Sequence, residues 1–203
     1  MSGKQEHEDE ELKPTFNEGY RPGEKKSVTE YAQLDAHDES LSRWKASLGI
    51  SANAAQAPST GPKVTIVTLT LTSATLPAGQ KISFNLADEA AVAALAKNPI
   101  TIKEGIEYSV GATFKVNRDV ISGLRYIHVV KRAGITVDRL EQMIGSYGPH
   151  PKGEVYSSTF PPEESPSGVL ARTGTYHVRS RFLDDDAEVY ADFQWSFKLG
   201  KEW

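Results

Sequence analysis

Residues 106–116 of the chain read IEYSVGATFKV, and every second residue of this stretch, starting at Ile106, is apolar. The stretch 189–199, VYADFQWSFKL, alternates in the same way. A period of two is typical of a β-strand that has one face on a hydrophobic core and the other face in solvent. Residues 124–130 and 176–182 indicate two further strands. The chain is therefore predicted to be all-β, an antiparallel β-sandwich.

The residues before these strands change phase once. Residues 64–66 alternate with one face apolar, and residues 67–71 alternate in the opposite phase, which predicts a β-bulge between the two halves. Residues 82–86 indicate a short strand, and residues 87–97 indicate a helical turn. Turn residues are found at 116–119, 145–149, 160–162 and 184–186.

Several apolar side chains fall on the faces that are predicted to point inward. Two sheets with this much apolar surface either close into a packed core or leave a slot for a lipid. Periodicity alone favours the closed core, because a sequence pattern does not reveal a cavity. The inward-facing set is Leu69, Leu71, Tyr108, Val110, Leu170, Val178, Phe193 and Trp195.

The first 60 residues differ in composition from the sandwich, which is expected to span residues 63–203. Residues 1–26 are rich in Glu, Lys, Gly and Pro, so we expect a disordered acidic tail. Residues 27–50 form a helical arm, with a capping box at Ser27–Glu30 and a second helix that starts between Asp35 and Asp38. Residues 51–62, SANAAQAPSTGP, are a linker.

The second helix of this arm has a narrow apolar stripe, formed by Leu41, Trp44 and Leu48. Helices this short are only marginally stable in isolation, so we expect the apolar stripe to pack against another surface. That surface is either the sandwich itself or a partner protein, and the linker favours a partner.

Charge and composition narrow the function. The net charge is −4, and residues 1–50 hold 11 acidic and 7 basic residues, so the imbalance lies in the arm. An acidic arm disfavours nucleic acid as a partner. The 203 residues contain no cysteine, and the charged N-terminus does not resemble a signal peptide, which fits a cytoplasmic protein.

The sequence gives no support for an enzyme. The five histidines are scattered, and neither a nucleophile elbow nor a phosphate-binding loop is present. The carboxylates at Asp184–Asp186 are explained by a turn between strands, and those at Glu163–Glu164 by a solvated loop. We therefore expect no catalytic residue, no metal and no cofactor.

Several short motifs, in order and at familiar spacing, make the chain resemble the Rho GDP-dissociation inhibitor family from about Tyr20 to Trp203. These motifs are Tyr20-Arg-Pro, Leu34-Asp35, Asp38-Glu-Ser-Leu41, Ile102-Lys-Glu-Gly-Ile-Glu-Tyr108, Phe114-Lys-Val-Asn-Arg118, Ser122-Gly-Leu-Arg-Tyr-Ile127, Gly145-Ser-Tyr-Gly-Pro149, Pro161-Pro-Glu-Glu-Ser-Pro166, Leu170-Ala-Arg172, Ser180-Arg-Phe182, Asp184-Asp-Asp186 and Glu202-Trp203.

This resemblance implies an immunoglobulin-like sandwich that holds a geranylgeranyl lipid between its sheets, and a flexible arm with two short helices that clamps a Rho-family small GTPase. The protein would inhibit GDP dissociation and extract the prenylated GTPase from membranes. It would prefer the GDP form, would be a monomer that forms a 1:1 heterodimer, and would not associate stably with membranes.

The resemblance also assigns residues to these roles. The GTPase-binding arm would use Tyr20, Asp38, Ser40, Leu41, Trp44 and Leu48, and the GTPase-facing edge of the sandwich would use Asp185 and Asp186. The acidic mouth for a basic tail would be Asp138, Glu163 and Glu164. The prenyl-binding residues would be Leu69, Leu71, Ile100, Tyr108, Val110, Val120, Leu170, Val178, Phe193 and Trp195.

Two positions depart from the family pattern. Phe193 stands where the family often has the first Trp of a Trp-x-Trp pair, which alters the shape of the slot, and residues 172–176 are one residue longer than the common form, which lengthens a hairpin. The alternative function is a general prenyl-protein carrier that does not control nucleotide exchange and has no need of residues 35–49.

Two further alternatives are weaker. A closed structural sandwich leaves the acidic mouth and the arm unexplained. A carbohydrate-binding sandwich needs aromatic side chains on its polar outer face, where Tyr190 is the only obvious candidate on its strand.

Overall fold

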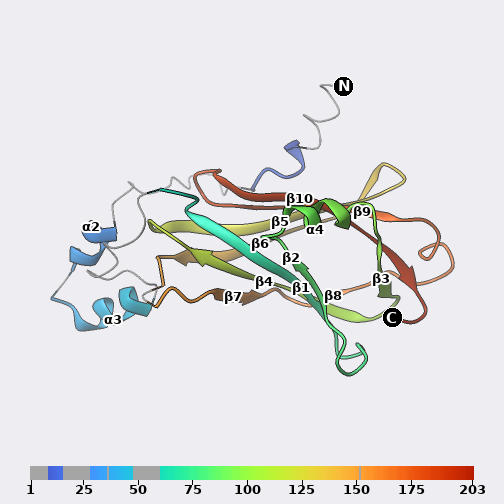
Figure 1. Cartoon of the computed structure of the whole chain (residues 1–203), viewed down its shortest axis with the longest axis horizontal. Helices are drawn as coiled ribbons and strands as arrows, with labels where there is room; N and C mark the ends of the chain where they lie inside the picture. The colour runs from blue at the N-terminus through green and yellow to red at the C-terminus, as the bar shows by residue number, and fades with distance from the viewer. Residues whose placement is uncertain (1–8, 16–27, 36, 48–59, 151) are drawn as a thin grey trace.

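The computed structural model describes residues 9–15, 28–35, 37–47, 60–150 and 152–203. Two β-sheets pack face to face, and two short helices of the arm lie beside the end of the sandwich where the first strand begins (Figure 1). This arrangement confirms the predicted all-β sandwich. None of the described helices is long and apolar enough to cross a membrane.

The first sheet has the strand order β2-β1-β4-β7, and the short strand β8 pairs with the beginning of β4. Its pairs are antiparallel, and a register shift between Ile66 and Thr68 confirms the predicted bulge in β1. The strands are β1 (Val64–Thr72), β2 (Ile82–Asn85), β4 (Glu107–Val116), β7 (Tyr156–Thr159) and β8 (Glu163–Glu164).

The second sheet has the order β3-β10-β9-β5-β6, and here one pair differs from the expected antiparallel arrangement. Strand β3 runs parallel to β10, because the chain crosses from the first sheet through the helix α4 (Glu89–Leu95) before it enters β3. The strands are β3 (Ile100–Lys103), β5 (Ile121–Arg132), β6 (Ile135–Tyr147), β9 (Tyr176–Leu183) and β10 (Val189–Gly200).

The inner faces of the two sheets form one hydrophobic core. Phe114, Tyr126 and Phe182 have no exposed surface, and Trp195 packs against Phe84 with ring centroids 5.5 Å apart. Two buried hydroxyl groups in this core share one network: Ser180 Oγ accepts a hydrogen bond from Trp195 Nε1 at 3.0 Å and lies 2.8 Å from the Tyr126 hydroxyl. This pairing removes the cost of burying the hydroxyl groups.

Strand β6 was not predicted, and it changes one turn assignment. It continues to Tyr147, so the turn that was expected to begin at Gly145 begins only after that residue. Most of its side chains are half-buried or exposed, because β6 is the edge strand of the second sheet. An edge strand needs little apolar periodicity, since only one neighbour and one face constrain it.

The arm contains the helices α2 (Val28–Gln33) and α3 (Glu39–Ser47). Asp38 caps α3, because its Oδ1 accepts hydrogen bonds from the backbone amides of Ser40 at 2.8 Å and Leu41 at 3.0 Å. Lys45 Nζ donates to the carbonyl of Leu34 and so joins α3 to the residue that follows α2. The predictions for Tyr20, Ser27 and Leu48 fall outside the described residues.

Residues 9–15, here called the N-terminal strap, differ from the disorder that composition predicts for residues 1–26. Leu12 in the strap is 1% exposed and packs on Ile127, Val129 and Leu183, on the outer face of the second sheet. A single well-buried leucine and matched charges thus give this acidic segment a docking position that its overall composition does not reveal.

Candidate functional site

A cleft of about 630 Å³ is lined by residues of both sheets near the beginning of β4, the end of β5 and the beginning of β9. In Figure 1 these strand ends lie at the end of the sandwich away from α2 and α3. The volume of the cleft lies within the ~300–1,000 Å³ that is typical of small-molecule sites. The first sheet contributes residues of β4 and β8, and the second contributes residues of β5, β6, β9 and β10. The lining residues are Tyr108, Val130, Arg132, Val137, Asp138, Arg139, Leu140, Glu163, Glu164, Pro166, Ala171, Tyr176 and Phe197.

Aromatic stacking builds the wall of the cleft on the second sheet. Tyr176 and Phe197 face each other on β9 and β10, with ring centroids 4.7 Å apart and planes at 4°. The Arg132 guanidinium lies 5.3 Å from the Tyr176 ring centre and donates to the carbonyls of Leu170 and Thr173. Arg132 therefore fixes the loop before β9 against the wall, so the cleft has a defined shape on this side.

Carboxylates from both sheets meet at the edge of the cleft. Glu163 on β8 accepts a hydrogen bond from the Tyr108 hydroxyl at 2.9 Å, and burial together with this carboxylate raises the pKa of Tyr108. Asp138 on β6 lies 3.5 Å from Nε2 of the buried His128, and its interaction with His128 lowers the pKa of the Asp138 carboxyl. The edge is therefore negatively charged at neutral pH and attracts cations.

His128, Asp138 and Glu163 are also the one group of described residues that is spaced to share a metal ion. His128 contributes Nε2 to this group, while its other ring nitrogen, Nδ1, lies 3.3 Å from the Tyr126 hydroxyl. The same carboxylates thus suit a cation of any kind, including an ammonium or guanidinium group.

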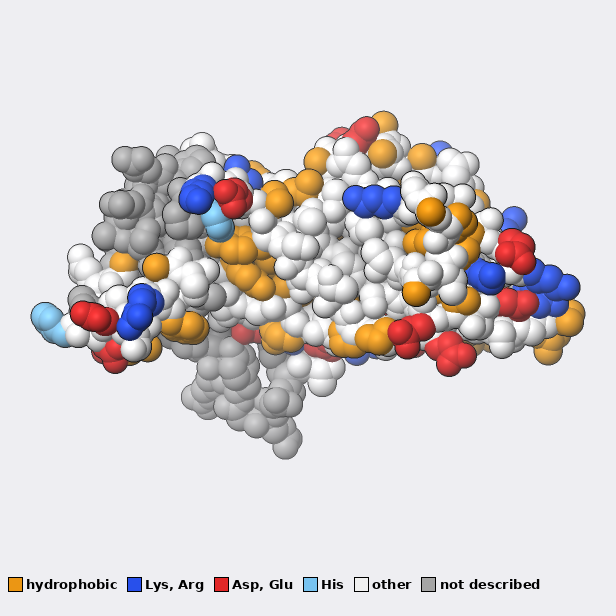
Figure 2. Space-filling view, turned by 90° about the horizontal axis from the view of Figure 1, so that it is seen from below, with side chains coloured by type: hydrophobic (Ala, Val, Ile, Leu, Met, Phe, Trp, Pro, Cys, Tyr) orange, Lys and Arg blue, Asp and Glu red, His pale blue; other side chains and the backbone are white. Residues whose placement is uncertain are grey.

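Apolar side chains surround this charged edge. Ile135 is 70% exposed at the beginning of β6, and Val169 and Leu170 are 70% and 79% exposed in the loop before β9. Figure 2 shows hydrophobic, acidic and basic side chains together at the end of the molecule away from α2 and α3. An apolar cleft with an amphipathic rim fits a ligand that has a hydrophobic chain and a positively charged attachment.

The structure places the predicted prenyl-binding residues in three different settings. Tyr108 alone lines the cleft. Ile100 is half-buried and packs against the core. Six of the other predicted residues are buried in the core itself: Leu69, Leu71, Val110, Val178, Phe193 and Trp195. Leu170 does not face inward as expected, because it is exposed in the loop before β9, and Val120 precedes β5 at the opposite end of the sandwich from the cleft.

Sequence reasoning missed seven apolar residues of the cleft. Val130 and Tyr176 lie on strands that were predicted, so their inward phase could have been read from the alternation of those strands, and Phe197 belongs to the alternating stretch that defines β10. The other four gave no signal, because they lie on the unpredicted β6 or in loops: Val137, Leu140, Pro166 and Ala171.

The two residues that were predicted for the GTPase-facing edge differ in burial. Asp186 is exposed, as a contact residue must be, but Asp185 is 8% exposed and forms an ion pair with Arg125 beneath the turn. Gly123 lies directly against the Asp185 carboxylate, so this side chain occupies a fitted position. The Asp185 carboxylate is therefore engaged beneath the turn, and of the two residues predicted for the GTPase-facing edge only Asp186 is exposed.

The arm residues that are described present an apolar surface. On α3, Trp44 is 57% exposed and Leu41 is 37% exposed. Asp38 and Ser40 lie at the start of the same helix, where the Asp38 carboxylate is used as the helix cap. The helix thus carries an uncovered tryptophan, which is costly for an isolated surface and typical of a protein-binding one.

Comparison with known proteins adds a family match and three similar relatives. Residues 3–202 match the model of the family described as RHO protein GDP dissociation inhibitor. The sequence is 45% identical to the Rho GDP-dissociation inhibitor of Schizosaccharomyces pombe, over 89% of this chain and 85% of that protein. It is 39% identical to the Rho GDP-dissociation inhibitor of Saccharomyces cerevisiae, over 92% of each. It is 37% identical to Rho GDP-dissociation inhibitor 1 of Bos taurus, over 97% and 91%.

Proposed function

The chain belongs to the RHO protein GDP dissociation inhibitor family, whose members are regulatory inhibitors and not enzymes, and we propose that it acts on prenylated Rho-family GTPases in their GDP form. It slows the release of GDP and removes the GTPase from membranes by holding the geranylgeranyl group in the cleft. The observation that carries this proposal is the apolar cleft between the sheets with carboxylates at its edge.

The cleft supplies the hydrophobic part of the interaction. Burial of a methylene group contributes about 0.8 kcal/mol, so a 20-carbon isoprenoid gains on the order of 10 kcal/mol. The lipid gains a similar free energy in a bilayer, so transfer to the cleft is close to balanced. Contacts between the two proteins must therefore decide the direction of transfer.

The carboxylates at the edge supply one such contact. Asp138 and Glu163 lie on opposite sheets at the mouth, and Glu164 lines the same cleft. The chain that precedes a prenylated cysteine is usually rich in Lys and Arg. A basic tail that follows its lipid into the cleft meets these carboxylates, which orients the tail and rejects an acidic one.

The arm supplies the second contact. Trp44 and Leu41 are exposed on α3 and offer an apolar surface to the switch region of the GTPase. If this surface binds the GDP-bound conformation more tightly than the open one, the nucleotide site stays closed. The proposal thus includes a cytoplasmic 1:1 complex that needs no cofactor.

A liposome experiment tests both parts. A geranylgeranylated Rho-family GTPase with fluorescent GDP is bound to liposomes, and the protein is added while GDP release and sedimentation are followed. We expect slower release and transfer of the GTPase to the supernatant. Ala171→Phe, which fills the cleft, is expected to prevent transfer, whereas Val155→Phe on the exposed surface is not.

The same experiment separates the alternative, a general prenyl-protein carrier. Trp44→Ala removes the exposed apolar surface of the arm without touching the cleft. A regulator loses control of GDP release in this variant, whereas a carrier behaves like the unchanged protein. Transfer of the GTPase with no effect of either protein on GDP release contradicts the proposed inhibition of exchange.

A further inference from the structure

The outer face of the second sheet carries a built binding site that the proposed function does not use. Ile127, Val129 and Leu183 point away from the sandwich core and form a small apolar patch on β5 and β9. Leu12 of the N-terminal strap covers this patch and is 1% exposed there. The patch is one of the two clusters of buried apolar side chains in the part of the chain that is described.

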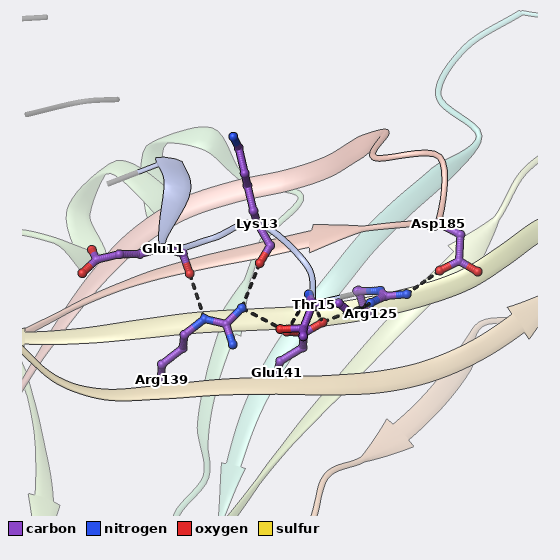
Figure 3. Close-up of polar contacts among 7 residues, drawn as sticks. All are labelled: Glu11, Lys13, Thr15, Arg125, Arg139, Glu141 and Asp185. Carbon is purple, nitrogen blue, oxygen red and sulfur yellow. Dashed lines mark hydrogen bonds and ion pairs between the residues drawn. The ribbon is translucent and has the colours of Figure 1, made fainter. Parts of the chain in front are cut away.

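On one side of Leu12 the strap is held by β6. Arg139 donates from Nε to the Glu11 carbonyl at 2.9 Å and from Nη2 to the Lys13 carbonyl at 2.8 Å. Glu141 accepts hydrogen bonds from the Thr15 amide at 3.0 Å and from the Thr15 hydroxyl at 2.9 Å. Figure 3 shows that Arg139 and Glu141 both point at the strap and contact its backbone.

On the other side the strap is held through its acidic side chains. Asp9 lies between Arg179 at 2.9 Å and Arg181 at 2.8 Å, both on β9. Glu11 pairs with Lys131 on β5 at 2.7 Å and accepts a hydrogen bond from Thr136 at 2.6 Å. The contacts to Asp9 hold the pKa of its carboxyl below the usual value.

These contacts define the kind of ligand that the face takes. It needs a short turn-forming segment with a leucine for the patch, acidic side chains for the basic residues of β5 and β9, and backbone carbonyls for Arg139 on β6. The described residues of the face supply five basic side chains for this purpose, Arg125, Lys131, Arg139, Arg179 and Arg181. Asp9, Glu11 and Leu12 meet these requirements in the chain itself.

The strap ends close to the place where the sandwich begins. Thr15 lies beside Arg125, whose partner Asp185 is joined by its amide to the Ser122 carbonyl at 3.0 Å. Gly61, at the other end of the arm, accepts a hydrogen bond from Arg118 at 3.0 Å. Arg118 lies in the short connection between β4 and β5, and Ser122 lies at the beginning of β5, so both ends of the arm are held at one end of the sandwich.

We propose that the outer face of β5, β6 and β9 is a docking site for the chain's own acidic strap, and that its occupancy strengthens capture of a GTPase by the arm. This inference rests on the proposed function. With the strap docked, α2 and α3 lie between two fixed points; with the strap released, they are fixed at one point only.

Holding a segment at both ends removes many of its unbound conformations, so less entropy is lost when it binds. The same restraint keeps the arm close to the end of the sandwich and raises its effective concentration there. We expect release of the strap to weaken GTPase binding on the order of threefold to tenfold.

Docking is tested first, without a GTPase. The chain has no cysteine, so spin labels can be attached to the full-length protein at Glu10→Cys and Met143→Cys, both at exposed positions. We expect a single short distance between the labels, which Leu12→Asp replaces by a broad, longer distribution. Val155→Asp, with the same change of charge on an exposed loop, is expected to leave the short distance unchanged.

A broad distribution in the protein that retains Leu12 overturns the docking site, whatever the GTPase result. If docking is present, the affinity for a prenylated GTPase is measured for the unchanged chain, Leu12→Asp and Val155→Asp. A loss confined to Leu12→Asp supports the proposal. Equal or tighter binding by Leu12→Asp overturns the role of the strap in capture. Failure of all three proteins to bind contradicts the proposed function instead and leaves the docking result standing.

Discussion

Replacement of Asp185 by alanine tests whether this residue supports the fold or faces a partner. The side chains of Arg125 and Asp185 are 6% and 5% exposed, so their ion pair is almost fully buried. Loss of one partner of a buried pair costs about 3–5 kcal/mol, because the other charge stays buried. Arg125 keeps Glu141 at 3.0 Å, so we expect the lower end of this range, about 3 kcal/mol.

This change should be plain in thermal and urea unfolding followed by tryptophan fluorescence. For a protein of this size each kcal/mol shifts Tm by about 2–4 °C, so Asp185→Ala is expected to melt roughly 6–12 °C lower. Asp186→Ala is the matched control, because Asp186 is exposed in the same turn, and its effect should stay within ~0.5 kcal/mol. Equal melting of the two variants would refute the buried pair and return Asp185 to the GTPase-facing edge.

Three further predictions concern single contacts. Gly123→Ala should destabilise the protein by more than about 1 kcal/mol in the same unfolding assay, because Gly123 has φ +63° and an added Cβ would collide with the Asp185 carboxylate. Gly134→Ala is the control, because Gly134 also has a positive φ but lies in open space, so its loss of stability measures backbone strain without a collision. Ser180→Ala should lower the free energy of unfolding by about 1–3 kcal/mol, because it leaves the buried Trp195 Nε1 without a hydrogen-bond acceptor. Ser157→Ala, at an exposed position, should leave stability unchanged. Equal stability of these two variants contradicts the buried hydrogen-bond network around Ser180. Burial raises the pKa of Glu141, but hydrogen bonds from Thr15 and the arginines outweigh burial and hold this pKa below its ordinary value. The contribution of Glu141 to strap docking is therefore complete above the ordinary pKa and is lost as the pH falls through the lowered one. The spin-label distance should lengthen only in acid, and a distance that stays short at a pH where NMR shows Glu141 protonated contradicts this linkage.

The strands that cross the core could be predicted because their side chains obey two constraints at once. Each strand has one buried and one exposed face, so a slip of one residue is visible as a change of phase. The bulge between Ile66 and Thr68 was found in this way, and β4 and β10 were found from unbroken alternation. The parallel pairing of β3 with β10 gave no such signal, because alternation does not encode which strand is the neighbour.

The strap shows why local composition can mislead. Residues 1–26 contain too little apolar surface to fold alone, yet Leu12 needs only one small patch, which lies more than a hundred residues away in the sequence. The strand that Leu12 contacts did carry a signal in its sequence. Ile127 and Val129 are apolar on the face of β5 opposite to Tyr126 and Val130, and a strand that is apolar on both faces is covered on both.

The cleft was predicted in kind but mostly not in its residues, because it depends on how far the sheets separate at one end. Leu69 and Trp195 have the same inward phase as Tyr108, but they lie where the sheets are in contact. Leu170 is apolar without belonging to a strand, so its inward assignment had no periodic support. The carboxylates Asp138 and Glu163 were placed correctly at the mouth, and that assignment came from the resemblance to a family.

The two ends of the sandwich therefore make different demands on a partner. The cleft opens at one end, whereas the arm is fixed at the other, and β5 of 12 residues joins them over about 40 Å. A GTPase that engages both must lie along the sandwich, with its globular part at the arm and its lipidated tail at Asp138 and Glu163. Under the proposed function, retention of GDP would depend on the arm and removal from the membrane on the cleft, so variants of the two ends are expected to separate the two effects. The strap links them structurally, because its contacts run from Lys131 near the cleft to Arg125 near the arm.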